Sequence, residues 1–133
     1  GTFMPVRTEK IEDHRMHAED FSVSSEAASV INHAMDEGKR ILAVGTTTAR
    51  LLEHLMAEYG TIVPGAGSTD LFVFEGFQFR CVGALLTNFH LPCSTLLMLV
   101  TAFGGYDLIM DAYRSAVDKE YRFFSYGDAM LIL

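Results

Sequence analysis

Residues 87–98 read TNFHLPCSTLLM and separate two patterns of apolar side chains. Before this stretch, residues 82–86 form an apolar run of strand length, which is typical of a buried strand. After it, the apolar residues between 96 and 103 recur at spacings that let a helix bury most of its circumference. The stretch therefore predicts a strand, a polar corner and a helix.

The polar corner carries side chains suited to chemistry. Pro92 is typical of the approach to a helix, and Ser94 or Thr95 can accept hydrogen bonds from the first N–H groups of that helix. The start of a helix also carries the positive end of its dipole. Asn88 and His90 therefore stand beside a natural site for an anion or an electron-rich oxygen.

An earlier part of the chain has the pattern of a helix, a buried strand and a second helix. Ser24 or Ser25 is expected to cap a helix that runs to about Glu37. Residues 41–44 read ILAV, a buried strand, and the apolar spacing after them predicts a helix over about 46–59. This order favours an α/β fold with a mostly parallel sheet and flanking helices.

The corner after residues 41–44 is a second candidate for ligand binding. Gly45 allows another group to approach the backbone closely, and the hydroxyls of Thr46 and Thr47 can either cap the helix or contact a ligand. The G-x-G-x-x-G pattern of dinucleotide-binding proteins is absent. An ordinary helix cap and a binding corner both remain open from these residues alone.

The remaining segments complete one α/β domain over residues 1–133. Residues 61–68 are expected to form a loop. Residues 70–74 and 77–82 are expected to form two strands joined by a tight turn at Glu75-Gly76, either as a β-hairpin or as two neighbouring edge strands. A helix is predicted over 107–117, followed by strand-like segments at 121–124 and 129–133.

Composition limits the classes of protein that this chain can belong to. Half of its 133 residues are apolar, and no apolar run approaches the roughly 20 residues that span a bilayer. Its two cysteines suggest no disulfide framework and fit a reducing cytoplasm. The net charge of −7, with 10 Lys and Arg against 17 Asp and Glu, argues against a nucleic-acid platform unless a local patch around Arg40, Arg50 and Arg80 suffices.

A zinc site is an alternative reading of the histidines. His14 and His17 stand three residues apart beside carboxylates, and His90 and Cys93 would have to complete four ligands. No third or fourth ligand follows at matching spacing, so we expect no metal. Polar loop residues are the simpler interpretation of His14 and His17.

Four strings closely resemble the S-adenosylmethionine:tRNA ribosyltransferase-isomerases, in the order of that family. They are GTFMPV at 1–6, AVGTT at 43–47 with Arg50 following, TNFHLPCSTLLMLV at 87–100, and YRFFSYGDAM at 121–130. The resemblance implies that the chain is the C-terminal portion of a larger two-domain enzyme, with the N-terminal portion and a β-rich domain absent.

The resemblance also implies a reaction. Such enzymes transfer and isomerise the ribosyl moiety of S-adenosylmethionine onto 7-aminomethyl-7-deazaguanine in tRNA, which gives epoxyqueuosine in queuosine biosynthesis. S-adenosylmethionine is then a substrate, no cofactor or metal is needed, and the location is cytoplasmic, away from membranes. The basic surface for tRNA would lie on the absent portion, and the isolated chain would be inactive. A noncatalytic α/β binding or scaffold module is the alternative.

The same resemblance assigns candidate roles. His90 is the first candidate for the catalytic base, because the pKa of histidine lies near neutral pH and the helix dipole would lower it further, with His14 and His17 second. A histidine satisfied by local backbone bonds is the alternative for His90. The residues expected to contact substrate are Gly45, Thr46, Thr47, Arg50, Asn88, Ser94, Thr95, Tyr126 and Asp128.

One geometric hypothesis connects these residues. The carboxyl ends of strands 41–44 and 82–86 should open on the same edge of one sheet, which would place Thr46 and His90 around a common hollow.

Overall fold

The strand β4 (Val82–Asn88) is the centre of a three-stranded sheet in the computed structural model, which describes residues 16–133. β2 (Ile41–Val44) pairs with β4 in parallel, and β5 (Ala129–Ile132) pairs with its other edge in antiparallel orientation. The α/β class is confirmed, but the predicted parallel arrangement holds only for β2 with β4, and the other two pairings among the described strands are antiparallel.

A separate two-stranded ribbon pairs β1 (Glu19–Val23) with β3 (Gly65–Thr69) in antiparallel orientation. The prediction that residues 61–68 form only a loop was therefore wrong. β3 reads GAGST, and such small residues carry little strand signal of their own. They become a strand because β1, which is far away in sequence, supplies their hydrogen-bond partners.

The four helices in the described part of the chain agree with the sequence pattern. They are α1 (Ser25–Asp36), α2 (Thr46–Tyr59), α3 (Thr95–Gly104) and α4 (Tyr106–Asp118). Serine caps two of them as predicted: the hydroxyl of Ser24 accepts from the N–H of Ala27, and that of Ser94 accepts from the N–H of Leu97. Each cap satisfies an N–H group that has no partner inside its helix.

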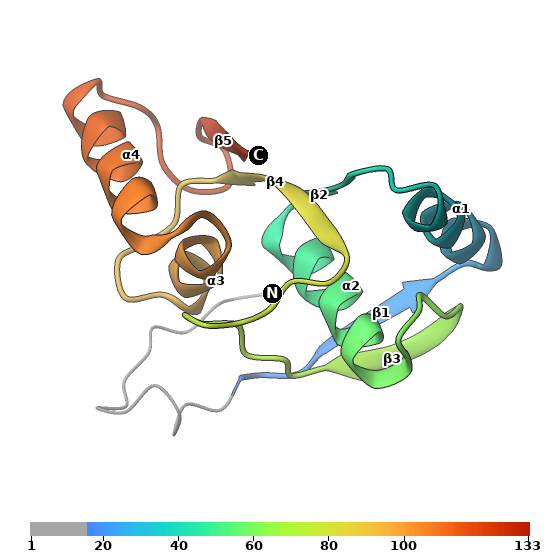
Figure 1. Cartoon of the computed structure of the whole chain (residues 1–133). Coiled ribbons are helices and arrows are strands. Elements are labelled where there is room, and N and C mark those ends of the chain that lie inside the picture. Colours follow the sequence, from blue (N-terminus) through green and yellow to red (C-terminus); the bar gives the residue numbers. More distant parts are fainter. Residues whose placement is uncertain (1–15) are drawn as a thin grey trace.

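The helices leave one side of the sheet uncovered. α2 contacts β2 and β4, and α3 packs against α2 and α4. In Figure 1, α2 and α3 lie below the sheet, and α4 lies to its left. Ala43 of β2 is fully buried, whereas its neighbours Leu42 and Val44, and Leu131 of β5, are exposed. The prediction of a fully buried strand at 41–44 thus holds for one face only, because side chains alternate along a strand.

The expected β-hairpin at residues 70–82 is absent. A tight turn does occur, since the N–H of Phe77 donates to the carbonyl of Phe74 at 3.0 Å, but residues 70–81 belong to no strand. The alternating rings of Phe77 and Phe79 pack edge-to-face on each other, and Phe79 packs in the same way on Phe103 of α3. The alternation reflects packing against a helix and not strand pairing.

The side chain of Glu53 accepts backbone hydrogen bonds from the segment that was expected to pair as a hairpin strand. Its carboxylate, on α2 and 1% exposed, accepts hydrogen bonds from the backbone N–H groups of Arg80, Cys81 and Val82 at 2.8–2.9 Å. A buried carboxylate is stable when donors of this kind surround it. Burial, together with the Glu53 charge, raises the pKa of the Cys81 thiol to about 11, which keeps the thiol protonated and unreactive.

The segment at 121–124, predicted as strand-like, belongs to a closed loop. The N–H of Phe124 donates to the carbonyl of Phe89, and that of Asp128 donates to the carbonyl of Arg122. These bonds turn the chain back on itself, and residues 121–124 pair with none of the described strands. The strand predicted at 129–133 is confirmed as β5.

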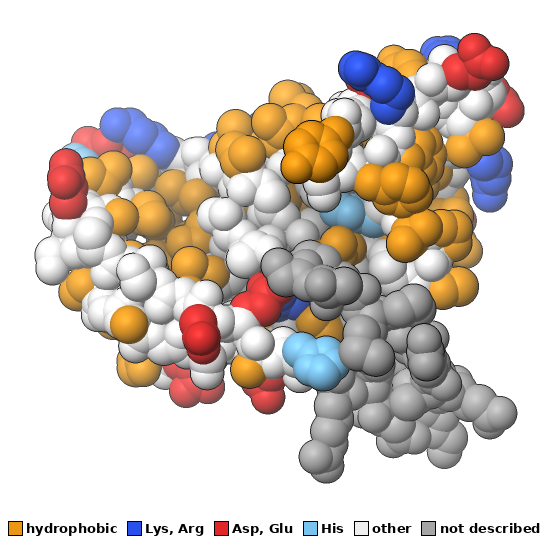
Figure 2. Space-filling view, turned by 180° about the vertical axis from the view of Figure 1, so that it is seen from behind, with side chains coloured by type: hydrophobic (Ala, Val, Ile, Leu, Met, Phe, Trp, Pro, Cys, Tyr) orange, Lys and Arg blue, Asp and Glu red, His pale blue; other side chains and the backbone are white. Residues whose placement is uncertain are grey.

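Charged side chains form no single basic area on the face shown in Figure 2, where Lys and Arg lie at separate places near the outline. Arg50, one member of the patch considered from the sequence, is 4% exposed and forms an ion pair with Glu19 of β1. It therefore contributes nothing to an exposed patch with Arg40 and Arg80.

None of the helices within residues 16–133 is by itself long and apolar enough to cross a bilayer. α3 and α4 meet the length and composition criteria only as a pair, and the chain bends by 117° between them.

We predict that Glu53→Ala lowers the free energy of unfolding by about 3–5 kcal/mol, because three backbone N–H groups lose their acceptor inside the protein. Urea denaturation at pH 7 measures the change. The matched control is Glu58→Ala, an exposed glutamate on the same helix, which should change stability by no more than about 0.5 kcal/mol. Equal effects of the two substitutions would contradict the role given to Glu53.

Candidate functional site

The corners that follow β2 and β4 lie at the same edge of the sheet. Parallel pairing of Val44 with Leu86 brings the two carboxyl ends together, and the N–H of Gly45 donates to the carbonyl of Leu86 at 2.8 Å. Gly45 has φ 90° and ψ 146°, a conformation that side-chain-bearing residues rarely adopt. The chain thus turns from β2 directly into α2 while remaining bonded to β4.

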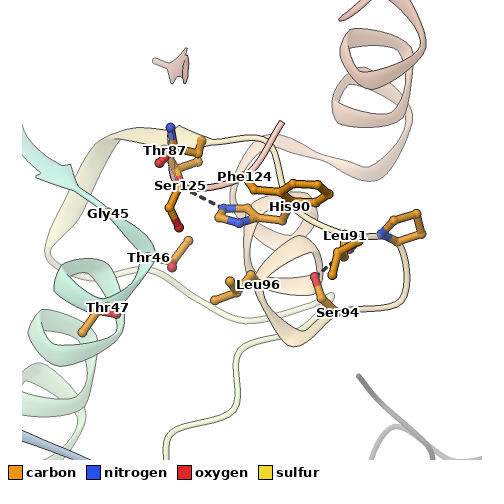
Figure 3. Close-up of a pocket in the computed structure, with 12 residues that line it drawn as sticks. Gly45, Thr46, Thr47, Thr87, His90, Leu91, Ser94, Leu96, Phe124 and Ser125 are labelled. Carbon is orange, nitrogen blue, oxygen red and sulfur yellow. Dashed lines mark hydrogen bonds between the residues drawn. The ribbon is translucent and has the colours of Figure 1, made fainter. Parts of the chain in front are cut away.

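A pocket of about 550 Å³ opens at this edge. Its size falls in the range typical of small-molecule sites. Figure 3 shows Thr46 and Thr47 on α2 at one side, with His90 and Phe124 at the other. The hypothesis that Thr46 and His90 border a common hollow is therefore consistent with the geometry. The lining residues are Gly45, Thr46, Thr47, Thr87, Asn88, His90, Leu91, Pro92, Ser94, Leu96, Phe124 and Ser125.

His90 is held in place by two hydrogen bonds. Its Nε2 lies 2.8 Å from the hydroxyl of Thr87, and its backbone N–H donates to the hydroxyl of Tyr113 at 2.9 Å. A hydroxyl can donate or accept, so the contact with Thr87 orients the ring in either tautomer. When Nε2 carries the proton, Nδ1 keeps the lone pair that a general base needs.

Burial sets the charge of this histidine. Loss of solvation lowers the pKa of His90 below its ordinary value of 6.5, since the charged imidazolium is disfavoured away from water. The direction agrees with the sequence-based expectation, although that expectation named the helix dipole as the cause. Burial likewise raises the pKa of the neighbouring Tyr113, so its hydroxyl stays protonated. Both groups are neutral at pH 7.

Ser94 lines the pocket but is committed to local structure. Its hydroxyl accepts from the N–H of Leu97 at 3.2 Å and donates to the carbonyl of Leu91 at 2.7 Å. These bonds occupy its donor and fix the corner that carries Leu91. Thr95, at the start of α3, is buried and does not line the pocket.

Asn88 connects the pocket to the loop before β5. Its side-chain amide donates to the backbone carbonyl of Asp128 at 3.1 Å. The carboxylate of Asp128 accepts from the backbone N–H and the guanidinium of Arg122, and these bonds lower the pKa of Asp128. Asp128 therefore closes a loop that borders the site, and its side chain does not line the pocket.

The other predicted site residues lie away from the pocket. Arg50 faces β1, where its guanidinium pairs with Glu19. The side chain of Tyr126 is fully exposed, and His17 is exposed and outside the pocket lining. His14 lies outside the described residues.

Sequence reasoning missed several lining residues. Thr87, Leu91, Pro92 and Leu96 all belong to the stretch at 87–98, so their position in that stretch was a usable signal. The remaining missed residues, Phe124 and Ser125, belong to the string at 121–130 that resembles the family, but the candidates chosen from it were Tyr126 and Asp128. Which of its side chains reach the pocket depends on backbone bonds to distant residues.

The lining of the pocket carries no Lys, Arg, Asp or Glu among the described residues. Within residues 16–133, no group of three or more His, Cys, Asp or Glu side chains is placed to hold a metal ion. The chemistry available at this edge comes from hydroxyls, one amide, one neutral imidazole and apolar surface. Since no cationic side chain is available in this lining, it suits a polar organic molecule better than the anion considered from the sequence.

The fold and the site together define an α/β protein with a ligand-sized pocket at the carboxyl edge of two parallel strands. A family model described as "Queuosine biosynthesis protein" matches residues 1–132 of the chain. The chain belongs to this family.

Two curated relatives illustrate the match. The S-adenosylmethionine:tRNA ribosyltransferase-isomerase of Symbiobacterium thermophilum is 58% identical over all of this chain and 39% of its own length. The enzyme of the same name from Natranaerobius thermophilus is 55% identical over 99% of this chain and 38% of its own length. The chain thus spans less than two-fifths of each of these relatives.

A solved structure extends the comparison to the fold. The crystal structure of S-adenosylmethionine tRNA ribosyltransferase from Thermotoga maritima superimposes with a TM-score of 0.80 at 53% sequence identity. The match covers 86% of this chain and 40% of that one. The α/β arrangement described above is therefore shared with a member of the family.

We predict that the His90 imidazole titrates below pH 6.5, because burial destabilises its charged form. The ring ¹³C–¹H signals followed by NMR from pH 4.5 to 8 report the midpoint, and His90→Asn identifies the signal by its disappearance. A midpoint at or above 6.5 would show that burial does not govern this histidine.

Proposed function

We propose that this chain supplies the S-adenosylmethionine-binding pocket of a tRNA ribosyltransferase-isomerase. In this reaction the ribosyl moiety of S-adenosylmethionine is transferred to 7-aminomethyl-7-deazaguanine in tRNA and isomerised, which gives epoxyqueuosine. One observation carries the proposal: the Gly45–Thr46 corner and His90 border the same pocket. The names of the family's curated members agree with this assignment.

His90 is proposed as the general base. The positive sulfur of S-adenosylmethionine acidifies the adjacent C5′ hydrogens, so a neutral imidazole can remove one of these protons. Loss of adenine, attack of the tRNA amine and closure of the epoxide then follow, with release of methionine. The lowered pKa of His90 keeps its ring uncharged at neutral pH, which is the form a base requires.

Thr46, Thr47 and Asn88 are proposed to hold the ribose and base of the substrate. Thr46 and Thr47, at the start of α2, bring hydroxyls to one wall of the pocket. Asn88, the last residue of β4, lies at the same edge of the sheet. Hydroxyls and amides match the hydrogen-bonding groups of a nucleoside. Ser94 supports the corner indirectly, because its hydroxyl caps α3 and donates to the carbonyl of Leu91.

The tRNA is proposed to bind chiefly through the remainder of a longer polypeptide. The net charge is −7, and Arg50 is buried in an ion pair. Neutralising phosphates requires exposed Lys and Arg. Since the chain spans less than two-fifths of its relatives, we propose that it is inactive by itself and acts in the cytoplasm as part of the larger enzyme, without a cofactor.

A noncatalytic α/β module is the competing function, and the short span relative to full-length members favours it for the isolated chain. A turnover assay on this chain beside the full-length protein separates the two. If only the full-length protein forms product, the chain holds part of a catalytic site that the rest of the enzyme completes. Absence of product from both would favour the noncatalytic module.

We predict that His90→Ala in the full-length protein lowers kcat at least about 100-fold, the usual contribution of a general base. Liquid chromatography of the modified nucleoside measures turnover. The control is His33→Ala, an exposed histidine on α1, which should leave kcat unchanged. Undiminished turnover by the His90 variant would exclude His90 as the base.

We predict that Thr46→Val weakens S-adenosylmethionine binding about 5- to 10-fold, because a methyl group replaces the hydroxyl that faces the pocket. Calorimetry on the full-length protein measures Kd. The matched control is Thr48→Val, an exposed position on the same helix turn that does not line the pocket. An unchanged Kd for Thr46→Val would remove this corner from the binding site.

A further inference from the structure

We propose that Phe124 is a positioning residue whose ring forms a stacking wall for a purine-type base in the pocket. The inference rests on the proposed function, because that function supplies a substrate with such a base. Phe124 lines the pocket, and its side chain is 52% exposed. A large aromatic ring that borders a hollow and remains half in solvent offers a flat face to a ligand.

The backbone of Phe124 is held in an unusual conformation. Its φ is 70°, a left-handed value that bulky residues rarely adopt. Two hydrogen bonds maintain it: the N–H of Phe124 donates to the carbonyl of Phe89 at 3.0 Å, and the N–H of Gly127 donates to the carbonyl of Phe124 at 2.9 Å. Strained residues that the surroundings fix in this way concentrate at ligand sites.

The rest of the loop prevents Phe124 from relaxing. A Cβ at Gly127 would lie 2.3 Å from the carbonyl oxygen of Arg122, so the tight return of the chain requires glycine there. Asp128 binds both the backbone and the guanidinium of Arg122, and Asn88 donates to the carbonyl of Asp128. The loop is thereby tied to the end of β4, which carries the site.

The neighbouring residue, Phe123, packs this loop against the core. Its ring stacks on Phe89 with centroids 5.0 Å apart and meets Tyr113 edge-to-face at 5.9 Å. Phe123 therefore joins this loop to the core. Phe124 meets the ring of Phe123 edge-to-face, with centroids 6.3 Å apart, and it remains 52% exposed, so this contact covers only part of its ring. The left-handed backbone at Phe124 instead presents the second ring at the pocket.

A purine-type base is the planar group that this wall fits. Stacking of a base on an aromatic side chain needs no charge, and the pocket lining has none among the described residues. The hydroxyls of Thr46 and Ser125, also in the lining, can bond the edge of a stacked ring. Two sources carry such a base in the proposed reaction: the adenine of S-adenosylmethionine and the 7-deazaguanine of the tRNA.

The test compares Phe124→Leu, Phe124→Tyr and Tyr126→Leu in the full-length protein. Phe124→Leu keeps apolar volume but removes the flat ring, whereas Phe124→Tyr keeps the ring. Tyr126→Leu is the matched control, because Tyr126 belongs to the same loop and is fully exposed outside the pocket. Calorimetry gives Kd for S-adenosylmethionine, and fluorescence anisotropy gives Kd for tRNA carrying 7-aminomethyl-7-deazaguanine.

We expect Phe124→Leu to raise the Kd for one of these two ligands about 10-fold or more. The Kd values of Phe124→Tyr and Tyr126→Leu should stay within about twofold of those of the parent protein. A loss confined to S-adenosylmethionine identifies adenine as the stacked base, and a loss confined to tRNA identifies the 7-deazaguanine.

Unchanged affinity of Phe124→Leu for both ligands, in a variant whose urea unfolding matches the parent, overturns the stacking role and leaves the proposed function intact. A parent protein that binds neither ligand overturns both.

Discussion

The parallel pairing of β2 with β4 is the constraint on which the site depends. It places two chain corners, at residues 45–47 and 87–94, at one edge of the sheet, although some 40 residues separate them along the chain. The bond from the N–H of Gly45 to the carbonyl of Leu86 extends the pairing beyond the end of β2. The turn needs the positive φ of 90° at position 45, which glycine adopts readily. Gly45 therefore fixes where α2 begins and, with it, the position of Thr46.

The same helix that begins at the pocket also fixes the far end of β4. α2 starts beside Gly45, and two turns later its Glu53 accepts the N–H groups of Arg80, Cys81 and Val82. These donors lie where β4 begins, so the helix holds the strand at its amino end while the Gly45 bond holds it near its carboxyl end. One buried carboxylate and one backbone bond together define how β4 lies on α2.

The sequence predicted those parts of the structure that local signals determine. Serines mark the starts of α1 and α3, and the glycine corner marks the start of α2, so these boundaries were correct. Thr46 and His90 could be placed together because parallel strands obey a general rule. The β3 strand, the false hairpin, the ion pair of Arg50 with Glu19 and the position of Phe124 all depend on partners far away in sequence. No local pattern encodes those partners.

Burial and neutrality of the pocket are linked to the charge of the proposed substrate. S-adenosylmethionine carries a positive sulfur, and a protonated imidazole beside it would be repelled. The site avoids this conflict because burial lowers the pKa of His90, which leaves the ring uncharged at neutral pH. Uncharged hydroxyls and an aromatic wall can then bind the nucleoside without adding charge of either sign. In the proposed mechanism, the desolvation at this corner of the fold thus favours the uncharged form of the base beside the cation.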